Sequence, residues 1–194
     1  YMISNSNPWD NLKFDINGIE EVKRKFFGTI HNIYSFFSLY SNIDGFNINS
    51  DHIKYVNRHE LDRWIISELN TLIKEVEEAY NNYEPTKSAR LISSFVQDNL
   101  SNWYVRLSRR RFWKGEFNQD KISAFQTLHE CLKKISIISS PISPFYMDNL
   151  FQDLNNSNKS VHLSNFPNYD LKLVDNNLEN KIRLSQKICS LALS

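Results

Sequence analysis

The sequence is poor in the residues that build phosphate loops, flexible linkers and disulfide frameworks. Its 194 residues include only four glycines and five prolines, which excludes a glycine-rich phosphate loop and a proline-rich linker. The two cysteines, Cys131 and Cys189, form neither a CxxC pair nor a disulfide framework, so we expect a reducing compartment, the cytoplasm. No apolar run approaches the roughly 18 residues that a membrane-spanning helix needs, and none is expected.

An excess of charge of one sign is also missing. With 23 Lys and Arg against 22 Asp and Glu, the formal net charge is +1, so any nucleic-acid role must depend on a local patch. The hydrophobic share of 41% is ordinary for a soluble globular protein that buries a core. The chain starts without an initiator Met or signal peptide and stops inside an apolar-periodic stretch. We therefore expect a piece of a longer protein.

Apolar residues recur with helical spacing along most of the chain. The pattern predicts helices over about 17–44, 61–83, 86–112, 120–140 and 145–154, and another from about 175 onward. Asn118 or Asp120 is the expected cap of the fourth helix, and Gly115 is the expected stop of the third. Residues 161–163 are expected to be extended. The predicted fold is an all-α antiparallel helix bundle with a short extended segment and a C-terminal helix.

Finer expectations follow from the same periodicity. Ile19 and Tyr83 belong to the apolar positions that mark their helices, and Leu107 belongs to the buried stripe of its own. The carboxylates of the 61–83 helix should form a solvated face with only a weak pair between Lys74 and Glu78; these carboxylates are Glu60, Glu68, Glu75 and Glu78.

The sequence offers no catalytic or metal-binding pattern. Its five histidines have no Cys or carboxylate partner at metal-ligand spacing, and no GxSxG, Walker or HExxH pattern occurs. His129 and Cys131 lie two residues apart, on different faces of a helix, which favours a structural role. We therefore assign no catalytic, cofactor-binding or metal-binding residue.

The stretch 101–114 differs from the rest of the chain because it carries five basic residues, no acidic one, and interleaved aromatics. Helical spacing puts Asn102, Arg106, Arg109 and Trp113 on one stripe; Trp103, Leu107 and Arg110 fall on the adjacent, core-directed side. Guanidinium groups that neutralise phosphates, beside an exposed Trp that offers a stacking plane, favour an RNA site. Two other interpretations stay open: a protein-binding face, or a structural face whose arginines complement the helix C-terminus.

These same residues resemble a known family. Residues 102–106 and 108–113 are similar to the signature helix of isoleucyl-tRNA synthetases in their eukaryote-like bacterial form. The resemblance covers the chain in the family's order and includes further segments: Leu12–Asp15, Lys25–Phe37, Leu61–Ile65 with Leu69, Asn70 and Tyr83, Pro141–Phe145 with Leu150 and Phe151, and Ser160–Leu163 with Pro167.

The resemblance implies a connector leaving a catalytic domain (1–16), an anticodon-binding helical bundle (17–167) and the start of a C-terminal appendage (168–194). The parent enzyme would use ATP and Mg²⁺ to attach isoleucine to its tRNA, and any Zn²⁺ would lie outside these residues. An editing domain would remove mischarged valine, because one methylene gives too little discrimination by binding alone. The family's His-Ile-Gly-His and Lys-Met-Ser-Lys-Ser motifs are absent here, so this piece would be non-catalytic.

The expected partners are the anticodon stem-loop of tRNA(Ile) and the catalytic and editing domains of the same chain, with the protein a monomer. Our hypothesis is that Arg106, Arg109, Arg110, Arg111 and Lys114 contact RNA phosphates. In the same hypothesis Trp113 provides a stacking surface and Asn102 reads a base edge. The alternatives are the same module of a valyl-tRNA synthetase and a helical protein-interaction domain without RNA contact.

Overall fold

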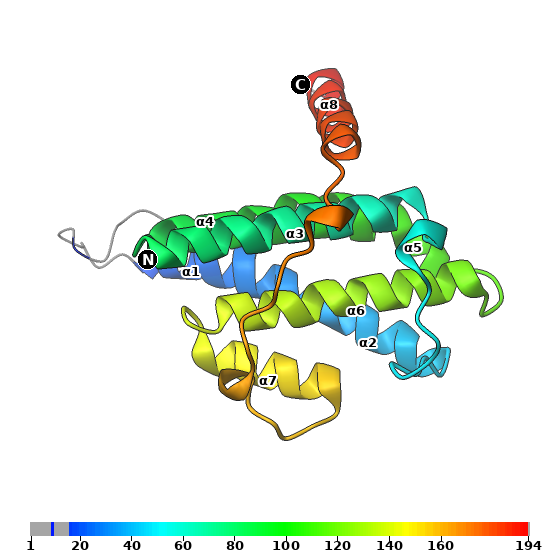
Figure 1. The fold of residues 1–194 in the computed structure, drawn as a ribbon, viewed down its shortest axis with the longest axis horizontal. Helices are drawn as coiled ribbons and strands as arrows, with labels where there is room; N and C mark the ends of the chain where they lie inside the picture. Colours follow the sequence, from blue (N-terminus) through cyan, green and yellow to red (C-terminus); the bar gives the residue numbers. More distant parts are fainter. Residues whose placement is uncertain (1–8, 10–15, 194) are drawn as a thin grey trace.

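The computed structural model describes residue 9 and residues 16–193. These residues form a bundle of helices without a strand among them, which confirms the all-α prediction (Figure 1). The expected connector 1–16 lies outside the described residues except for Trp9 and Ile16. The resembling segment 12–15 falls within this undescribed part.

The first long helix is continuous but not uniform. It consists of α1 (Ile16–Val22), a π-helical stretch η1 (Lys23–Phe27) and α2 (Gly28–Ile43). It ends where Gly45 takes a φ of +63°, which a residue without Cβ adopts at little cost. Its buried stripe begins in the π-helical stretch and comprises Phe26, Ile30, Ile33 and Phe37. Ile19, one of the apolar positions that mark this helix in the sequence, is 42% exposed because the buried stripe starts only after it.

A helical hairpin forms one side of the bundle. α3 (Glu60–Asn81) starts at His59, whose Nδ1 accepts a hydrogen bond from the backbone N–H of Leu61. α4 (Pro85–Ser94) opens with its proline at the first position, where the fixed φ of the ring fits a helix and the missing N–H breaks no helical hydrogen bond. Tyr83 lies in the turn between them with a positive φ and an 86% exposed side chain, so its predicted place within the helix is wrong. The helix ends two residues before it.

The hairpin's second arm carries a long π-helical insertion. α4 continues through η3 (Phe95–Val105) into α5 (Arg106–Trp113). A π-turn holds more residues than an α-turn, so the buried stripe shifts relative to a 3.6-residue period. Tyr104 and Phe112 therefore face the core, whereas Leu107, predicted to be buried, is 52% exposed.

The remaining helices close the bundle. Asn118 caps α6 (Gln119–Ser139) by accepting a hydrogen bond from the N–H of Lys121 at 2.9 Å. α7 (Pro144–Asn155) ends at left-handed Asn156 and packs against α6. Short 3₁₀ turns occupy Tyr55–Asn57 (η2), Val161–Leu163 (η4) and Leu171–Leu173 (η5). The prediction of an extended 161–163 segment is wrong, because the Ser160 side chain caps a 3₁₀ turn there.

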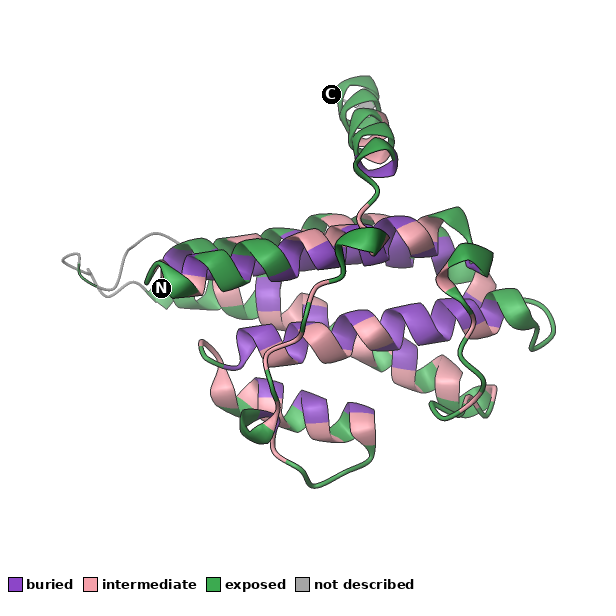
Figure 2. Ribbon diagram, in the orientation of Figure 1, coloured by how far each residue is buried: buried purple, intermediate pink, exposed green. Residues whose placement is uncertain are grey.

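The C-terminal helix is attached to the bundle only by its first half. The segment after α7 crosses the face of the bundle, and α8 (Asn176–Leu193) then projects away from it (Figure 1). α8 contacts α3 through its first two turns: Glu179 accepts hydrogen bonds from Ser67 and Thr71, and Lys181 and Arg183 pair with Glu60 and Glu68. Figure 2 shows most of its remaining length exposed.

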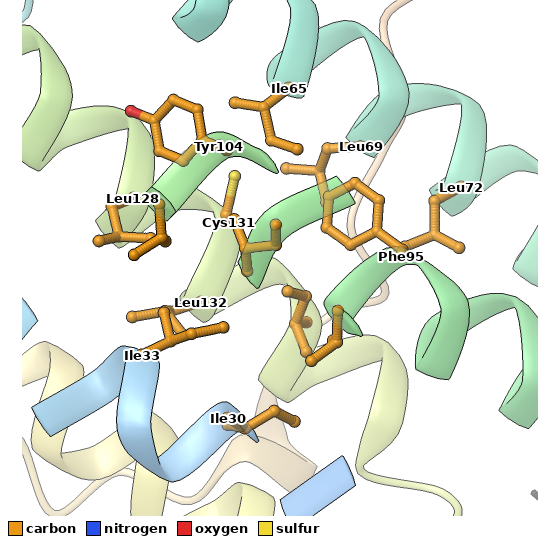
Figure 3. Close-up of a cluster of buried hydrophobic side chains, with 14 of the residues drawn as sticks. Ile30, Ile33, Ile65, Leu69, Leu72, Phe95, Tyr104, Leu128, Cys131 and Leu132 are labelled. Carbon is orange, nitrogen blue, oxygen red and sulfur yellow. The ribbon is translucent and has the colours of Figure 1, made fainter. Parts of the chain in front are cut away.

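The core lies where α2, α3, η3 and α6 meet (Figure 3). Branched aliphatic side chains fill it together with aromatic rings, among them Trp64, Phe95 and Tyr104, and with the thiol of Cys131. Cys131 is buried, and burial raises the pKa of its thiol. This cysteine acts as a small apolar core residue.

His129 makes a pH-sensitive contact between α6 and α7. Its Nε2 donates to the carbonyl of Leu154 at 3.0 Å, and burial lowers the pKa of the ring below its usual 6.5. The folded protein keeps the ring neutral while the unfolded chain protonates it, so this stability is full above pH 6.5 and is lost as the pH falls towards the lowered value. Between about pH 7 and 5, wild type should lose more unfolding free energy in urea denaturation than His129→Gln. Equal losses would contradict this role.

Candidate nucleic-acid interface

The predicted cationic cluster lies at the end of the hairpin's second arm. On α5 and the residue after it, the side chains of Arg106, Arg109, Arg110 and Lys114 are all exposed. Trp113 is 59% exposed beside them. The predicted core-directed position of Arg110 is wrong, for the same reason as that of Leu107: the π-helical stretch before α5 shifts the buried stripe.

Arg111 points inward instead. Its side chain is 12% exposed and forms a bidentate pair with Asp62 of α3, with distances of 2.7 Å to Oδ1 and 2.8 Å to Oδ2. The same guanidinium binds both carboxylate oxygens of Asp120 at the start of α6. Because two carboxylates already engage this group, the structure gives Arg111 an anchoring position and not that of an open phosphate contact.

Asp62 is the centre of this arrangement. It is fully buried and also accepts hydrogen bonds from the hydroxyls of Tyr104 at 2.8 Å and Ser123 at 2.7 Å. Burial, followed by the carboxylate of Asp62, raises the pKa of the Tyr104 phenol well above its usual value. Burial lowers the pKa of Arg111, but hydrogen bonds to Asp62 and Asp120 outweigh this effect and leave the pKa raised. The group therefore stays charged and ties α5 to α3 and α6.

An aromatic layer supports the same end of α5. Phe112 is fully buried and packs edge-on against Phe36 of α2 and Phe125 of α6, each at a centroid distance of 5.1 Å. Phe125 in turn stacks on Phe46, also at 5.1 Å. The arginines of α5 thus stand on a packed layer of rings, which fixes the direction of the helix.

The two residues that precede the cations differ in exposure. Asn102 is exposed on η3, about one turn before Arg106. Trp103 is half-buried and packs against the core, as its expected core role requires. The structure therefore brings Asn102, the four exposed cations and Trp113 to one stretch of surface, and separates Arg111 from them.

Sequence reasoning missed two carboxylates of α3. Asp62 could have been found, because it shares a helix face with Ile66, Leu69 and Ile73, and a lone carboxylate on an apolar face requires a buried partner. Glu68, predicted to be solvated, has a 13% exposed side chain and accepts hydrogen bonds from Trp64 and Asn99. Burial, and then the nearby charge of Glu179, raises the pKa of Glu68. The Lys74–Glu78 pair does form, at 3.9 Å and exposed.

The described residues present neither a metal-ligand cluster nor a helix suited to a membrane. No group of three or more His, Cys, Asp or Glu side chains there is placed to hold a metal ion. None of the helices in that part of the chain is both long and apolar enough to cross a membrane.

Comparison with known proteins decides the family. The sequence model described as "Anticodon-binding domain of tRNA ligase" matches residues 62–194. This chain belongs to that family. The matched region of the anticodon-binding domain includes Asp62, all of α5 and both ends of α6, so the exposed cations and their anchor fall within the family match.

Curated relatives refine this assignment. Proteins named isoleucine–tRNA ligase from Bacteroides thetaiotaomicron, Porphyromonas gingivalis and Cytophaga hutchinsonii are 57%, 56% and 53% identical to the whole of this chain. The chain spans 17% of the length of the first two and 18% of the third. The resemblance of this anticodon-binding domain to isoleucyl-tRNA synthetases is therefore confirmed.

Proposed function

We propose that this domain binds the anticodon stem-loop of an isoleucine tRNA, as a non-catalytic part of an isoleucine–tRNA ligase. The observation that carries the proposal is the exposed set Arg106, Arg109, Arg110 and Lys114 beside the exposed ring of Trp113. No carboxylate occurs within residues 101–114, so phosphates meet no local repulsion from this segment.

Each group has a distinct task. The four exposed cations neutralise phosphates and fix the position of the RNA, which carries no sequence information by itself. Trp113 stacks on an unpaired loop base, and Asn102 offers an amide to a base edge. Arg111 is assigned to positioning α5, since its guanidinium is held by Asp62 and Asp120.

We propose that this domain is one part of a longer enzyme. Its proposed activity attaches isoleucine to its tRNA with ATP and Mg²⁺, as a monomer in the cytoplasm, with catalytic and editing domains as neighbours of this bundle. The names of the relatives favour isoleucine over valine as the amino acid. Residues 168–194, including α8, are proposed to begin the appendage that follows the bundle.

The test is a competition assay with this chain. Labelled isoleucine tRNA is bound at about 50 and 200 mM salt and displaced by unlabelled isoleucine, valine and methionine tRNAs. We expect isoleucine tRNA to compete best, and a change of its anticodon to remove the advantage. Equal competition by all three would contradict selective recognition. Absence of binding at the lower salt would contradict the RNA role and favour a protein-docking face.

A further inference from the structure

The buried side of the helical arm formed by α4, η3 and α5 follows a strict four-residue repeat. Its innermost row runs from Ile92 to Phe112, and each member is at most 1% exposed; between these two lie Val96, Leu100, Tyr104 and Ser108. An α-helix needs 3.6 residues for each turn, so a row with four per turn uses about two residues more over its five steps. The π-helical stretch η3 takes up these two surplus residues.

The orientation that the surplus residues give to α5 is unfavourable within α5 itself. Ser108 is fully buried, and its hydroxyl has no hydrogen-bond partner among the described residues. Leu107 beside it is apolar but 52% exposed. A π-helix is moreover rare, and most examples are single turns, often at functional sites. Contacts with other helices must therefore hold α5 in this orientation.

Those contacts come from α2, α3 and α6. Arg111 donates two hydrogen bonds to Asp62 of α3, at 2.7 and 2.8 Å, and the same guanidinium binds Asp120 of α6. Phe112 packs edge-on against one ring of α2 and one of α6. The bidentate pair with buried Asp62 is the strongest of these contacts, because both partners are charged and largely withdrawn from water.

A regular α-helix would give α5 a second orientation. Each residue turns an α-helix by about 100°, so releasing two surplus residues would rotate α5 by about 200°. Trp103 and Leu107 would then face the bundle with Arg110 on the same side, which is the arrangement that helical spacing predicts from the sequence. In this orientation Leu107 gains burial, Ser108 regains water, and Arg110 leaves the exposed set.

We propose that α5 has these two orientations, and that Arg111 is a positioning residue that selects the one in which the cations face outward. Its pair with Asp62 belongs to the outward orientation only, and so opposes the local preference of Leu107 and Ser108 for the other. RNA that binds the exposed cations shifts the population in the same direction. The inference rests on the proposed function, since the outward orientation matters for RNA binding.

The first test is the salt dependence of isoleucine tRNA binding by Arg111→Ala. Part of the variant molecules should turn α5 inward, and the affinity falls with the outward fraction, about tenfold if that fraction is one tenth. The molecules that bind use the same exposed cations, so the slope of log affinity against log salt should equal that of wild type. A slope lower by about 0.7–0.9 would identify a lost phosphate contact. That result, or an unchanged affinity, would overturn the proposal.

A second-site variant tests the competing orientation. Leu107→Gln removes the apolar side chain and Ser108→Ala the buried hydroxyl, so adding both to Arg111→Ala should restore affinity to within about twofold of wild type. Leu39→Gln replaces a leucine on α2 that is 54% exposed, and this matched control should restore nothing. The folded fraction of each variant is measured by circular dichroism and its affinity corrected for it. Persistent weak binding by the triple variant, or equal rescue by the control, would contradict the two orientations.

Amide hydrogen exchange gives a readout that needs neither RNA nor loss of Arg111. The change between orientations breaks backbone hydrogen bonds of η3, so the amides of η3 exchange through it. Leu107→Gln/Ser108→Ala should slow this exchange about fivefold, more than in α3 or α6. Equal exchange of η3 in the variant and wild type would overturn the inference. Failure of wild type to bind the tRNA would instead overturn the proposed function, and the exchange comparison would still decide whether α5 has two orientations.

Discussion

Replacing Arg111 with alanine should lower the free energy of unfolding by about 3–5 kcal/mol. The variant leaves the carboxylate of Asp62 fully buried, with only the hydroxyls of Tyr104 and Ser123 as partners. Two neutral donors cannot replace a bidentate guanidinium, because an unpaired buried charge pays a large desolvation cost. Urea denaturation at neutral pH, followed by circular dichroism, measures the loss.

Two comparisons separate this effect from a general loss of charge. Arg109→Ala, two residues away and exposed, should change stability by no more than about 0.5 kcal/mol. In Asp62→Asn/Arg111→Ala the buried charge is gone as well, so the double variant should lose less than the sum of the single losses. A loss below about 1 kcal/mol for Arg111→Ala would show that the pair does not anchor α5.

Replacing all four exposed cations by alanine should weaken RNA binding on the order of a hundredfold at about 50 mM salt. The cations are Arg106, Arg109, Arg110 and Lys114. Each phosphate contact releases counterions, so the slope of log affinity against log salt should fall by about 0.7–0.9 per lost contact, or about 3 in total. A binding titration with isoleucine tRNA at several salt concentrations gives both quantities.

A matched variant controls for net charge. Alanine at four exposed cations on other surfaces removes the same total charge, and Lys74, Lys87, Arg90 and Lys172 serve this purpose. We expect this control to keep most of the affinity and of the salt slope, because short-range contacts dominate once distant charges are screened. Equal losses in the two variants would mean that the RNA responds to overall charge and not to α5.

Local signals determined much of the fold before any tertiary contact was known. Helical periodicity gave the helices, and their ends followed from identifiable chemistry: Asn118 caps α6, Pro85 opens α4 and Gly45 ends α2 with positive φ. The sequence also located the candidate interface, because the excess of positive charge in 101–114, five cations and no carboxylate, can be read directly from the residues. These features depend on residues close together in the chain, which is why the sequence alone determined them.

Only the tertiary structure decided how the cluster divides. Arg109 and Arg111 are chemically identical and two residues apart, yet one is exposed and the other is paired with buried Asp62, 49 positions away. The π-helical stretch before α5 turns the helix so that Leu107 faces outward, a shift that a 3.6-residue period cannot show. Orientation depends on packing between distant segments, and on this point the local sequence carried no information.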